Sequence, residues 1–125
     1  MALLRDEAEV LLLHNPRCSK SRAAHALLEE RGVVFRERRY LEDPLDRAEL
    51  TELAALLGRP TREWVRSGEA AHAEAGLDEA SSDASLLDAV AKHPVLLERP
   101  ILVRGARARV GRPTDALLEL LEEAS

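Results

Sequence analysis

Residues 10–32 of the 125-residue chain read VLLLHNPRCSKSRAAHALLEERG, and this stretch decides the fold. Val10-Leu11-Leu12-Leu13 is a continuous apolar run, which predicts a strand buried on both faces of a sheet. From about Ser19, apolar residues recur at helical spacing until Gly32, where glycine supplies a C-terminal stop. The segment from Val33 to Tyr40 predicts a second strand. The chain should therefore open with a strand, helix, strand unit whose crossover is right-handed.

Cys18, the only cysteine, lies where the first strand gives way to the helix. Unpaired N–H groups and the positive end of the helix dipole stabilise a thiolate there, and Arg17 and Lys20 add positive charge nearby. A lone cysteine is more often a small buried hydrophobic residue. The polar and basic surroundings favour a reactive thiolate instead, because an inert thiol does not need helix-entry chemistry around it. We therefore expect Cys18 to be a nucleophile, or to lie beside a bound anion.

The middle of the chain is predicted to be helical. Three capping signals predict three helices, and they lie at Asp46, at Thr61, and at Ser81 or Ser82. Asp46 is followed three residues later by Glu49, the pattern of a capping box, and Gly58 ends that helix. The last of the three should run until His93.

The C-terminal part predicts a hairpin and a final helix. Ile101–Arg104 and Arg107–Val110 read as two strands joined by a two-residue turn that begins with Gly105. Pro113 and Asp115 introduce the last helix. This order resembles the thioredoxin-like arrangement, an α/β fold with a four-stranded mixed sheet and a helical insertion between its βαβ and ββα halves. The resemblance implies a cis-proline beside the reactive thiol, and Pro100 occupies the matching place.

Length and composition limit the possible functions. We expect one domain over residues 1–125, because no linker-like stretch divides the chain. The net charge is −5 and no basic block is present, so nucleic acid is not an expected ligand. No apolar run approaches the roughly 20 residues that cross a bilayer, so no membrane span is expected. One cysteine and the absence of a signal-peptide pattern predict a cytoplasmic protein, and no spacing predicts a metal site.

Arginine dominates the positive charge. Of 18 lysines and arginines, only Lys20 and Lys92 are lysine. The forked donors of arginine suit bidentate capture of oxyanions, although most single arginines are simply solvated surface residues.

Several separate segments together resemble one family, the glutaredoxin-type arsenate reductases, from about Leu11 to Leu121. These segments are His14-Asn15-Pro16-x-Cys18-x-x-Ser21-Arg22, Tyr40-Leu41-Glu42-x-Pro44, Val65-Arg66, His93-Pro94, Arg99-Pro100-Ile101 and Gly111-Arg112-Pro113. A single NPxC sequence would be weak evidence. The resemblance is specific because all six segments occur in order, at loops and helix ends around one predicted sheet.

The resemblance implies a catalytic nucleophile at Cys18 and an arsenate site formed by Arg66, Arg99 and Arg112. A multiply charged tetrahedral oxyanion needs several forked donors, and an attacking thiolate needs the repulsion between negative charges cancelled. The supporting residues implied are His14, Asn15, Ser21 and Pro100. A cationic His14 would lower the thiol pKa, whereas a neutral one would hydrogen-bond the loop.

The implied reaction is attack of the Cys18 thiolate on arsenate, followed by reduction to arsenite with glutathione as co-substrate and glutaredoxin as partner. No bound cofactor is expected. Because the chain has no second cysteine, an internal disulfide cannot complete the cycle, so the reductant must come from outside.

Two other functions remain open at this point. Regulators of the Spx type share the fold and bind RNA polymerase, although many carry a Cys-x-x-Cys switch and Ser21 stands at the second cysteine position here. A general glutathione-linked thiol reductase would keep the thiol chemistry but has less need of three arginines.

Overall fold

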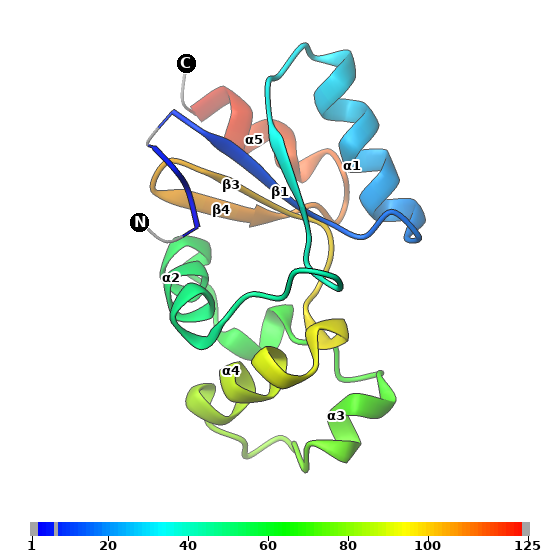
Figure 1. Ribbon diagram of the computed structural model, residues 1–125, viewed down its shortest axis with the longest axis vertical. Coiled ribbons are helices and arrows are strands. Elements are labelled where there is room, and N and C mark those ends of the chain that lie inside the picture. Colours follow the sequence, from blue (N-terminus) through cyan, green and yellow to red (C-terminus); the bar gives the residue numbers. More distant parts are fainter. Residues whose placement is uncertain (1–2, 7, 124–125) are drawn as a thin grey trace.

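The computed structural model describes residues 3–6 and 8–123, and a four-stranded mixed sheet lies at its centre (Figure 1). Its strands are β1 (Val10–His14), β2 (Arg36–Arg39), β3 (Ile101–Arg104) and β4 (Arg107–Val110). The order across the sheet is β2-β1-β3-β4. The first two strands are parallel and the other two pairs are antiparallel. This is the α/β architecture predicted from the sequence.

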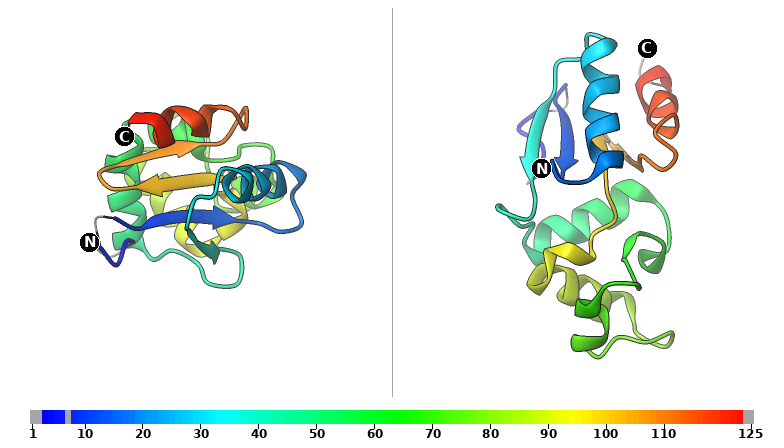
Figure 2. Two further views of the ribbon diagram at one scale, coloured as in Figure 1. Left: turned by 90° about the horizontal axis from the view of Figure 1, so that it is seen from above. Right: turned by 90° about the vertical axis from the view of Figure 1, so that its right-hand side faces the viewer.

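Helices flank the sheet and form the insertion between β2 and β3. They are α1 (Ser19–Glu30), α2 (Arg47–Leu57), α3 (Ala70–Glu74), α4 (Asp83–Lys92) and α5 (Ala116–Glu123), with the 3-10 helices η1 (Thr61–Trp64) and η2 (Pro94–Leu96). Figure 2 shows α1 and α5 on one face of the sheet and the insertion on the side of the opposite face. Among the described residues, no helix has both the length and the apolar character needed to cross a membrane.

The apolar run of β1 is explained by burial on both faces. Val10 and Leu12 belong to the core cluster that contains buried residues of α1 and α5. Leu11 and Leu13 belong to the larger cluster shared with the insertion. Successive side chains of a strand point to opposite faces, so four consecutive apolar residues supply both clusters. The predicted central strand is confirmed.

Capping residues define the ends of α2 as the sequence predicts. Asp46 accepts a hydrogen bond from the Glu49 N–H at 2.8 Å, and the Glu49 carboxylate accepts one from the Asp46 N–H at 3.0 Å. Gly58 follows the helix with a φ of 62°, the left-handed conformation that glycine adopts without strain. For α4 the cap is Ser82, which accepts from the Ser85 N–H.

Three local predictions differ from the structure. The second strand begins at Arg36 rather than Val33, since only Arg36–Arg39 pair with β1. Thr61 is the first residue of η1 rather than its cap, which is Pro60. Helix α3 was not predicted because it buries none of its residues, and a helix without a buried apolar face leaves no periodic signal.

Candidate active site

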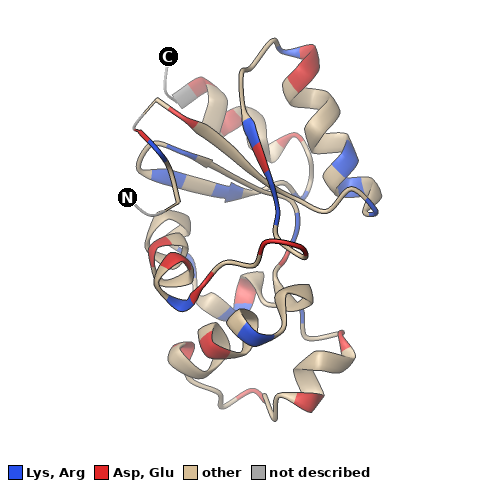
Figure 3. Ribbon diagram, viewed as in Figure 1, with Lys and Arg blue, Asp and Glu red and all other residues tan. Residues whose placement is uncertain are grey.

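Cys18 is the N-cap residue of α1, at the turn that follows β1. Its backbone is extended, with φ −96° and ψ 126°, and its N–H donates to the Asn15 carbonyl at 3.0 Å. The thiol is partly buried and makes no capping hydrogen bond. Figure 3 shows basic residues at this N-terminal end of α1 and along β2 and β4. The predicted placement of the thiol at a helix N-terminus is therefore what the structure has.

The pKa of the Cys18 thiol lies below its usual value of 9.0. Partial burial is the largest influence and by itself raises the pKa. The nearby backbone N–H groups of Ser21 and Lys20 and the guanidinium of Arg99 lower it, and together they outweigh burial. These are the effects expected at a helix N-terminus beside a cation. The surroundings thus favour the thiolate.

Arg112 lies directly beside the sulfur. Its Nη2 is 4.0 Å from Cys18 Sγ. Its Nε donates to the Arg99 carbonyl at 2.7 Å and lies 3.2 Å from a carboxylate oxygen of Glu98. Two anchors on one nitrogen fix the guanidinium, so its other end is held toward the thiol.

Arg99 reaches the same region from the segment that enters β3. Its Nε and Nη1 are buried and have no hydrogen-bond partner among the described residues. Buried charged donors are almost always paired, so a guanidinium with two unpartnered nitrogens next to a thiol is suited to an anionic ligand. The peptide bond between Arg99 and Pro100 is cis, as the resemblance implied, and so is the bond between Arg112 and Pro113.

Arg66 comes from the insertion and is tied to the same segment through the backbone. Val65 forms an isolated antiparallel bridge with Leu97. The Arg66 N–H donates to the Leu96 carbonyl at 2.7 Å, and the Glu98 N–H donates to the Trp64 carbonyl at 3.0 Å. The Arg66 guanidinium itself forms an ion pair with Glu69. These contacts hold the segment that carries Arg66 beside the residues that directly precede Arg99.

Tyr40 is a buried residue of this region to which the sequence analysis gave no role beyond the motif. Its side chain is only 1% exposed, and burial raises its pKa to about 12. The charges of Arg99, Cys18 and Arg66 also act on its hydroxyl, which therefore lies within electrostatic range of all three. The signal that was missed is the parallel pairing of β1 with β2, in which His14 lies opposite Arg39. This pairing places the residues that follow the two strands at one edge of the sheet.

His14, Ser21 and Asn15 form a connected group behind the thiol. His14 Nδ1 is 2.7 Å from Ser21 Oγ, and that oxygen accepts the Asn15 N–H at 2.9 Å. The Ser21 hydroxyl hydrogen is then free to be donated to His14 Nδ1, which requires the unprotonated nitrogen. Burial lowers the pKa of His14, while Glu37 at 3.8 Å raises it less strongly. Of the two open possibilities for His14, the structure favours the neutral ring.

The sequence-predicted residues therefore gather as follows. Arg112 and Arg99 lie at the thiol, Arg66 is attached to the same segment, and His14 and Ser21 support the loop from behind. The carboxylates Glu98 and Glu69, which hold two of the arginines, were not singled out from the sequence. Within residues 3–6 and 8–123, no three His, Cys, Asp or Glu side chains are grouped as they would be around a metal ion.

Comparison with known proteins follows the same lines. A family model described as the ArsC family matches residues 13–120. An arsenate reductase of Neisseria meningitidis serogroup A is 44% identical over 115 residues, which span 90% of this chain and 98% of that protein. YfgD, an uncharacterized protein of Escherichia coli, is 43% identical over 115 residues, or 90% of this chain and 97% of that protein.

Among solved structures, an arsenate reductase from Vibrio cholerae superposes with a TM-score of 0.85 at 41% identity. The alignment covers 91% of this chain and 98% of that one. The strand order, the site at the start of α1 and the comparisons agree, and the chain belongs to the ArsC family, with the thioredoxin-like fold that the order of its elements predicted.

Proposed function

We propose that this chain reduces arsenate to arsenite, with the Cys18 thiolate as nucleophile and with glutathione and glutaredoxin as reductants. The observation that carries the proposal is one ionisable sulfur that lies 4.0 Å from Arg112 Nη2 and under the electrostatic influence of Arg99. Two buried nitrogens of that Arg99 side chain have no hydrogen-bond partner among the described residues. Such a group is suited to a tetrahedral oxyanion. The names of the N. meningitidis and V. cholerae proteins support arsenate as that anion.

In the first step, Cys18 Sγ attacks arsenic and one arsenic–oxygen bond breaks. The oxygen leaves as water after taking up protons, and arsenic remains As(V) in a covalent thiolate ester. Attack of an anion on an anion is slow unless the charges are neutralised. Arg99 and Arg112 supply fixed positive charge at the reacting atoms, which stabilises the charge that develops there.

Reduction then needs two thiols from outside the chain. Glutathione forms a second arsenic–sulfur bond with loss of another water. The glutaredoxin thiolate attacks the glutathione sulfur, and the electron pair of the arsenic–sulfur bond stays on arsenic, which becomes As(III). Glutathione and glutaredoxin leave as a mixed disulfide, and water releases arsenite from Cys18. The chain has one cysteine, so it cannot supply the second thiol itself.

The test is arsenite formation by the purified chain with arsenate, glutathione and glutaredoxin, coupled to NADPH oxidation by glutathione reductase. Cys18→Ser should abolish turnover. Arg112→Lys should lower kcat/KM for arsenate by about 100-fold, the usual effect of removing one donor to a reacting oxyanion. Arg31→Lys, at the opposite end of α1, is the matched control and should leave turnover unchanged. Arsenite formation no faster than that of Cys18→Ser would overturn the proposal.

The same preparation separates the other two functions. Reduction of a glutathione mixed disulfide without arsenite formation would identify a general thiol reductase. Retention of RNA polymerase on the immobilised chain, again without arsenite, would identify a regulator. No feature of the described site favours either over an oxyanion reductase.

A further inference from the structure

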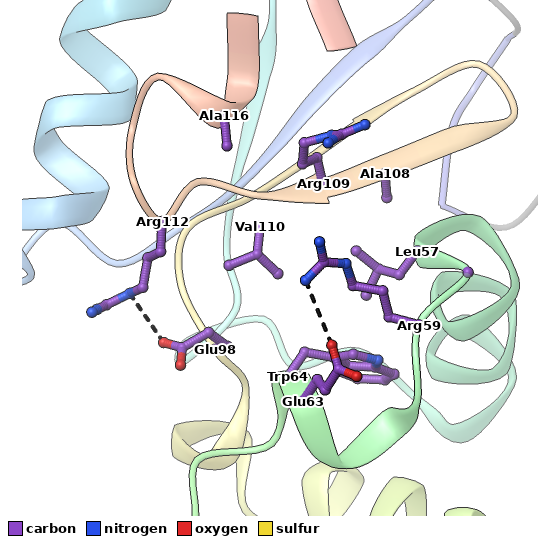
Figure 4. Close-up of a pocket in the computed structure, with 11 residues that line it drawn as sticks. Leu57, Arg59, Glu63, Trp64, Glu98, Ala108, Arg109, Val110, Arg112 and Ala116 are labelled. Carbon is purple, nitrogen blue, oxygen red and sulfur yellow. Dashed lines mark ion pairs between the residues drawn. The ribbon is translucent and has the colours of Figure 1, made fainter. Parts of the chain in front are cut away.

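Glu98 directly precedes Arg99, and its carboxylate contacts both arginines that lie at the thiol. Its Oε1 accepts a hydrogen bond from the Arg99 N–H at 3.1 Å and lies 3.2 Å from Arg112 Nε. Figure 4 shows the ion pair with Arg112, where both residues line a cavity of about 390 Å³ between β4 and the insertion. One oxygen atom therefore joins the two segments that carry these arginines, although the proposed reaction gives Glu98 no role.

Arg112 pairs with Glu98 in a way that leaves its outer end open. Its Nε faces Glu98 Oε1 and donates to the Arg99 carbonyl at 2.7 Å, and neither Nη group donates to a carboxylate among the described residues. Arg38 shows the alternative, since both of its Nη groups donate to Glu49. A carboxylate bound in that bidentate manner occupies the edge that would otherwise bind an oxyanion. The contact through Nε keeps this edge of Arg112 available, with Nη2 4.0 Å from the sulfur.

The conformation of Glu98 is itself fixed through the backbone. Its N–H donates to the Trp64 carbonyl at 3.0 Å, in the segment that leads to Arg66. Its side chain is only 25% exposed, so the carboxylate is largely shielded from water. An acceptor held in this way limits the directions in which the guanidinium of Arg112 can lie, because the donors of that planar group keep a fixed geometry.

The balance of charge at the sulfur makes this orientation important. Glu98 and the ionised thiol of Cys18 are negative, and the two guanidinium groups beside them are positive. A group with equal numbers of both charges attracts a further anion only weakly from a distance. Binding of an oxyanion therefore depends on donors that lie at the correct distance and angle.

We propose that Glu98 is a positioning residue of the oxyanion site. Its Oε1 holds Arg112 by Nε and the Arg99 segment by the backbone N–H, so that both guanidinium groups face one anion beside the thiol. The hydrogen-bond acceptor does this, and the negative charge is not needed for it. The inference deepens the proposed function and rests on it, because it assigns the orientation of the donors that hold arsenate. Glu98 acts through the two arginines and not on the reacting atoms.

Two substitutions of equal charge separate the acceptor from the charge. Glu98→Gln keeps an oxygen acceptor with two lone pairs, whereas Glu98→Leu has a similar size and no acceptor. Glu98→Ala is a second variant without an acceptor, and it replaces Glu98→Leu if the latter does not fold. Asp88→Asn is the control for charge, because it removes one negative charge from an exposed ion pair with Arg47 between α2 and α4.

Anion binding gives the first readout, and it does not depend on turnover. Sulfate is the probe, and its binding is measured as the concentration that halves the rate of Cys18 alkylation by iodoacetamide. Glu98→Leu should need about tenfold more sulfate than Glu98→Gln, the effect of losing one hydrogen bond to a charged group. Glu98→Gln and Asp88→Asn should need no more sulfate than the unchanged chain. Sulfate that protects Glu98→Gln and Glu98→Leu equally, or protects neither, overturns the role of Glu98.

Turnover gives the second readout. Glu98→Leu should lower kcat/KM for arsenate about 100-fold relative to Glu98→Gln, as displacement of a binding group by about 1 Å can do. Glu98→Gln should stay within threefold of the unchanged chain, because the acceptor is kept. A loss of turnover in Glu98→Gln as large as that in Glu98→Leu would assign the effect to the charge and overturn the proposal.

A double-mutant cycle tests whether Glu98 acts through Arg112. In the Arg112→Ala background, the difference in sulfate concentration between Glu98→Gln and Glu98→Leu should shrink from about tenfold to about threefold or less, because no Arg112 guanidinium is left to orient. A difference that stays tenfold in this background would show that Glu98 acts elsewhere, and the proposal would be wrong.

Failure of the two proposals can be told apart. If the chain makes no arsenite but the sulfate difference between Glu98→Gln and Glu98→Leu is found, arsenate reduction is wrong and the role of Glu98 in anion binding stands. If arsenite forms equally fast in both variants and sulfate protects both equally, the reductase stands and Glu98 has no positioning role.

Discussion

At the residue scale, the pKa of the Cys18 thiol is set by influences that act in opposite directions. Burial raises the thiol pKa, whereas the N–H groups of Ser21 and Lys20 and the charge of Arg99 together lower it by more than burial raises it. A change at Arg99 therefore removes one of the lowering influences and leaves burial in place. The reactivity of the sulfur depends on its neighbours rather than on the cysteine alone.

We predict that Cys18 alkylation by iodoacetamide follows a pH profile with its midpoint below 9.0 in the folded protein. Arg99→Leu should move that midpoint upward, because a nearby cation is lost while the thiol stays partly buried. The measurement is the alkylation rate against pH, with urea-unfolded protein as reference. An identical midpoint in folded and unfolded protein would contradict this expectation.

Ser21 is the residue that joins the turn to His14. It is fully buried, and its Oγ contacts both His14 Nδ1 and the Asn15 N–H. Ser21→Ala should lower the free energy of unfolding by about 1–3 kcal/mol, because the buried His14 Nδ1 and the partly buried Asn15 N–H both lose a partner. Ser19→Ala, at an exposed position on the first turn of the same helix, should change it by less than about 0.5 kcal/mol. Urea denaturation of both variants tests the difference.

At the scale of the elements, close packing between β3, β4 and α5 holds Arg99 and Arg112 at one place. The Gly111 N–H donates to the Pro100 carbonyl at 2.8 Å. A Cβ at Gly111 would lie 2.9 Å from Pro100 Cγ and 3.2 Å from Leu117 side-chain atoms. Position 111 therefore requires glycine because of space, and the two segments that carry the arginines meet there.

Gly111→Ala should accordingly destabilise the protein by about 1–3 kcal/mol through overpacking. Gly68→Ala is the control, since a Cβ there meets nothing within 4 Å. Urea unfolding gives the two free energies. Equal stability of the two variants would show that the Pro100 segment can shift to accept a methyl group.

The elements also show how much the sequence determines. Strand β1, helix α2 with its capping box, and the β3–β4 hairpin were predictable because apolar runs, caps and a glycine turn are local signals. Helix α3 was not, since it has no buried face. Within the site, Cys18 was visible from its helix position. The tie between Val65 and Leu97 is a long-range pairing that no local pattern announces, and Tyr40 joins the site only through strand register.

At the scale of the whole molecule, stability at low pH depends on groups whose pKa is lower in the folded protein than in the unfolded chain. Burial lowers the pKa of His14 below 6.5. The hydrogen bond to Arg38 lowers the pKa of Glu49 below 4.5. In both cases the unfolded chain binds protons more readily than the folded one, so the associated stability is complete above the unfolded pKa and is lost as pH falls.

We therefore expect the free energy of unfolding to decline in two stages. The first should begin as pH falls through 6.5 and come from His14. The second should begin below 4.5 and come from Glu49 together with Glu9, whose pKa is lowered by its hydrogen bond to Arg36. Urea unfolding at a series of pH values measures both. His14→Gln should flatten the first stage and leave the second, whereas an unchanged first stage would assign it to another group.

Cys18 and Trp64 occur once each, Cys18 at the start of α1 in the βαβ half and Trp64 on η1 in the insertion. A dye attached to the sulfur would accept excitation energy from the indole, so the natural sequence already contains a donor and an attachment point for resonance energy transfer. Any rotation of the insertion relative to the sheet would then register as a change in transfer efficiency, without engineering a single new residue.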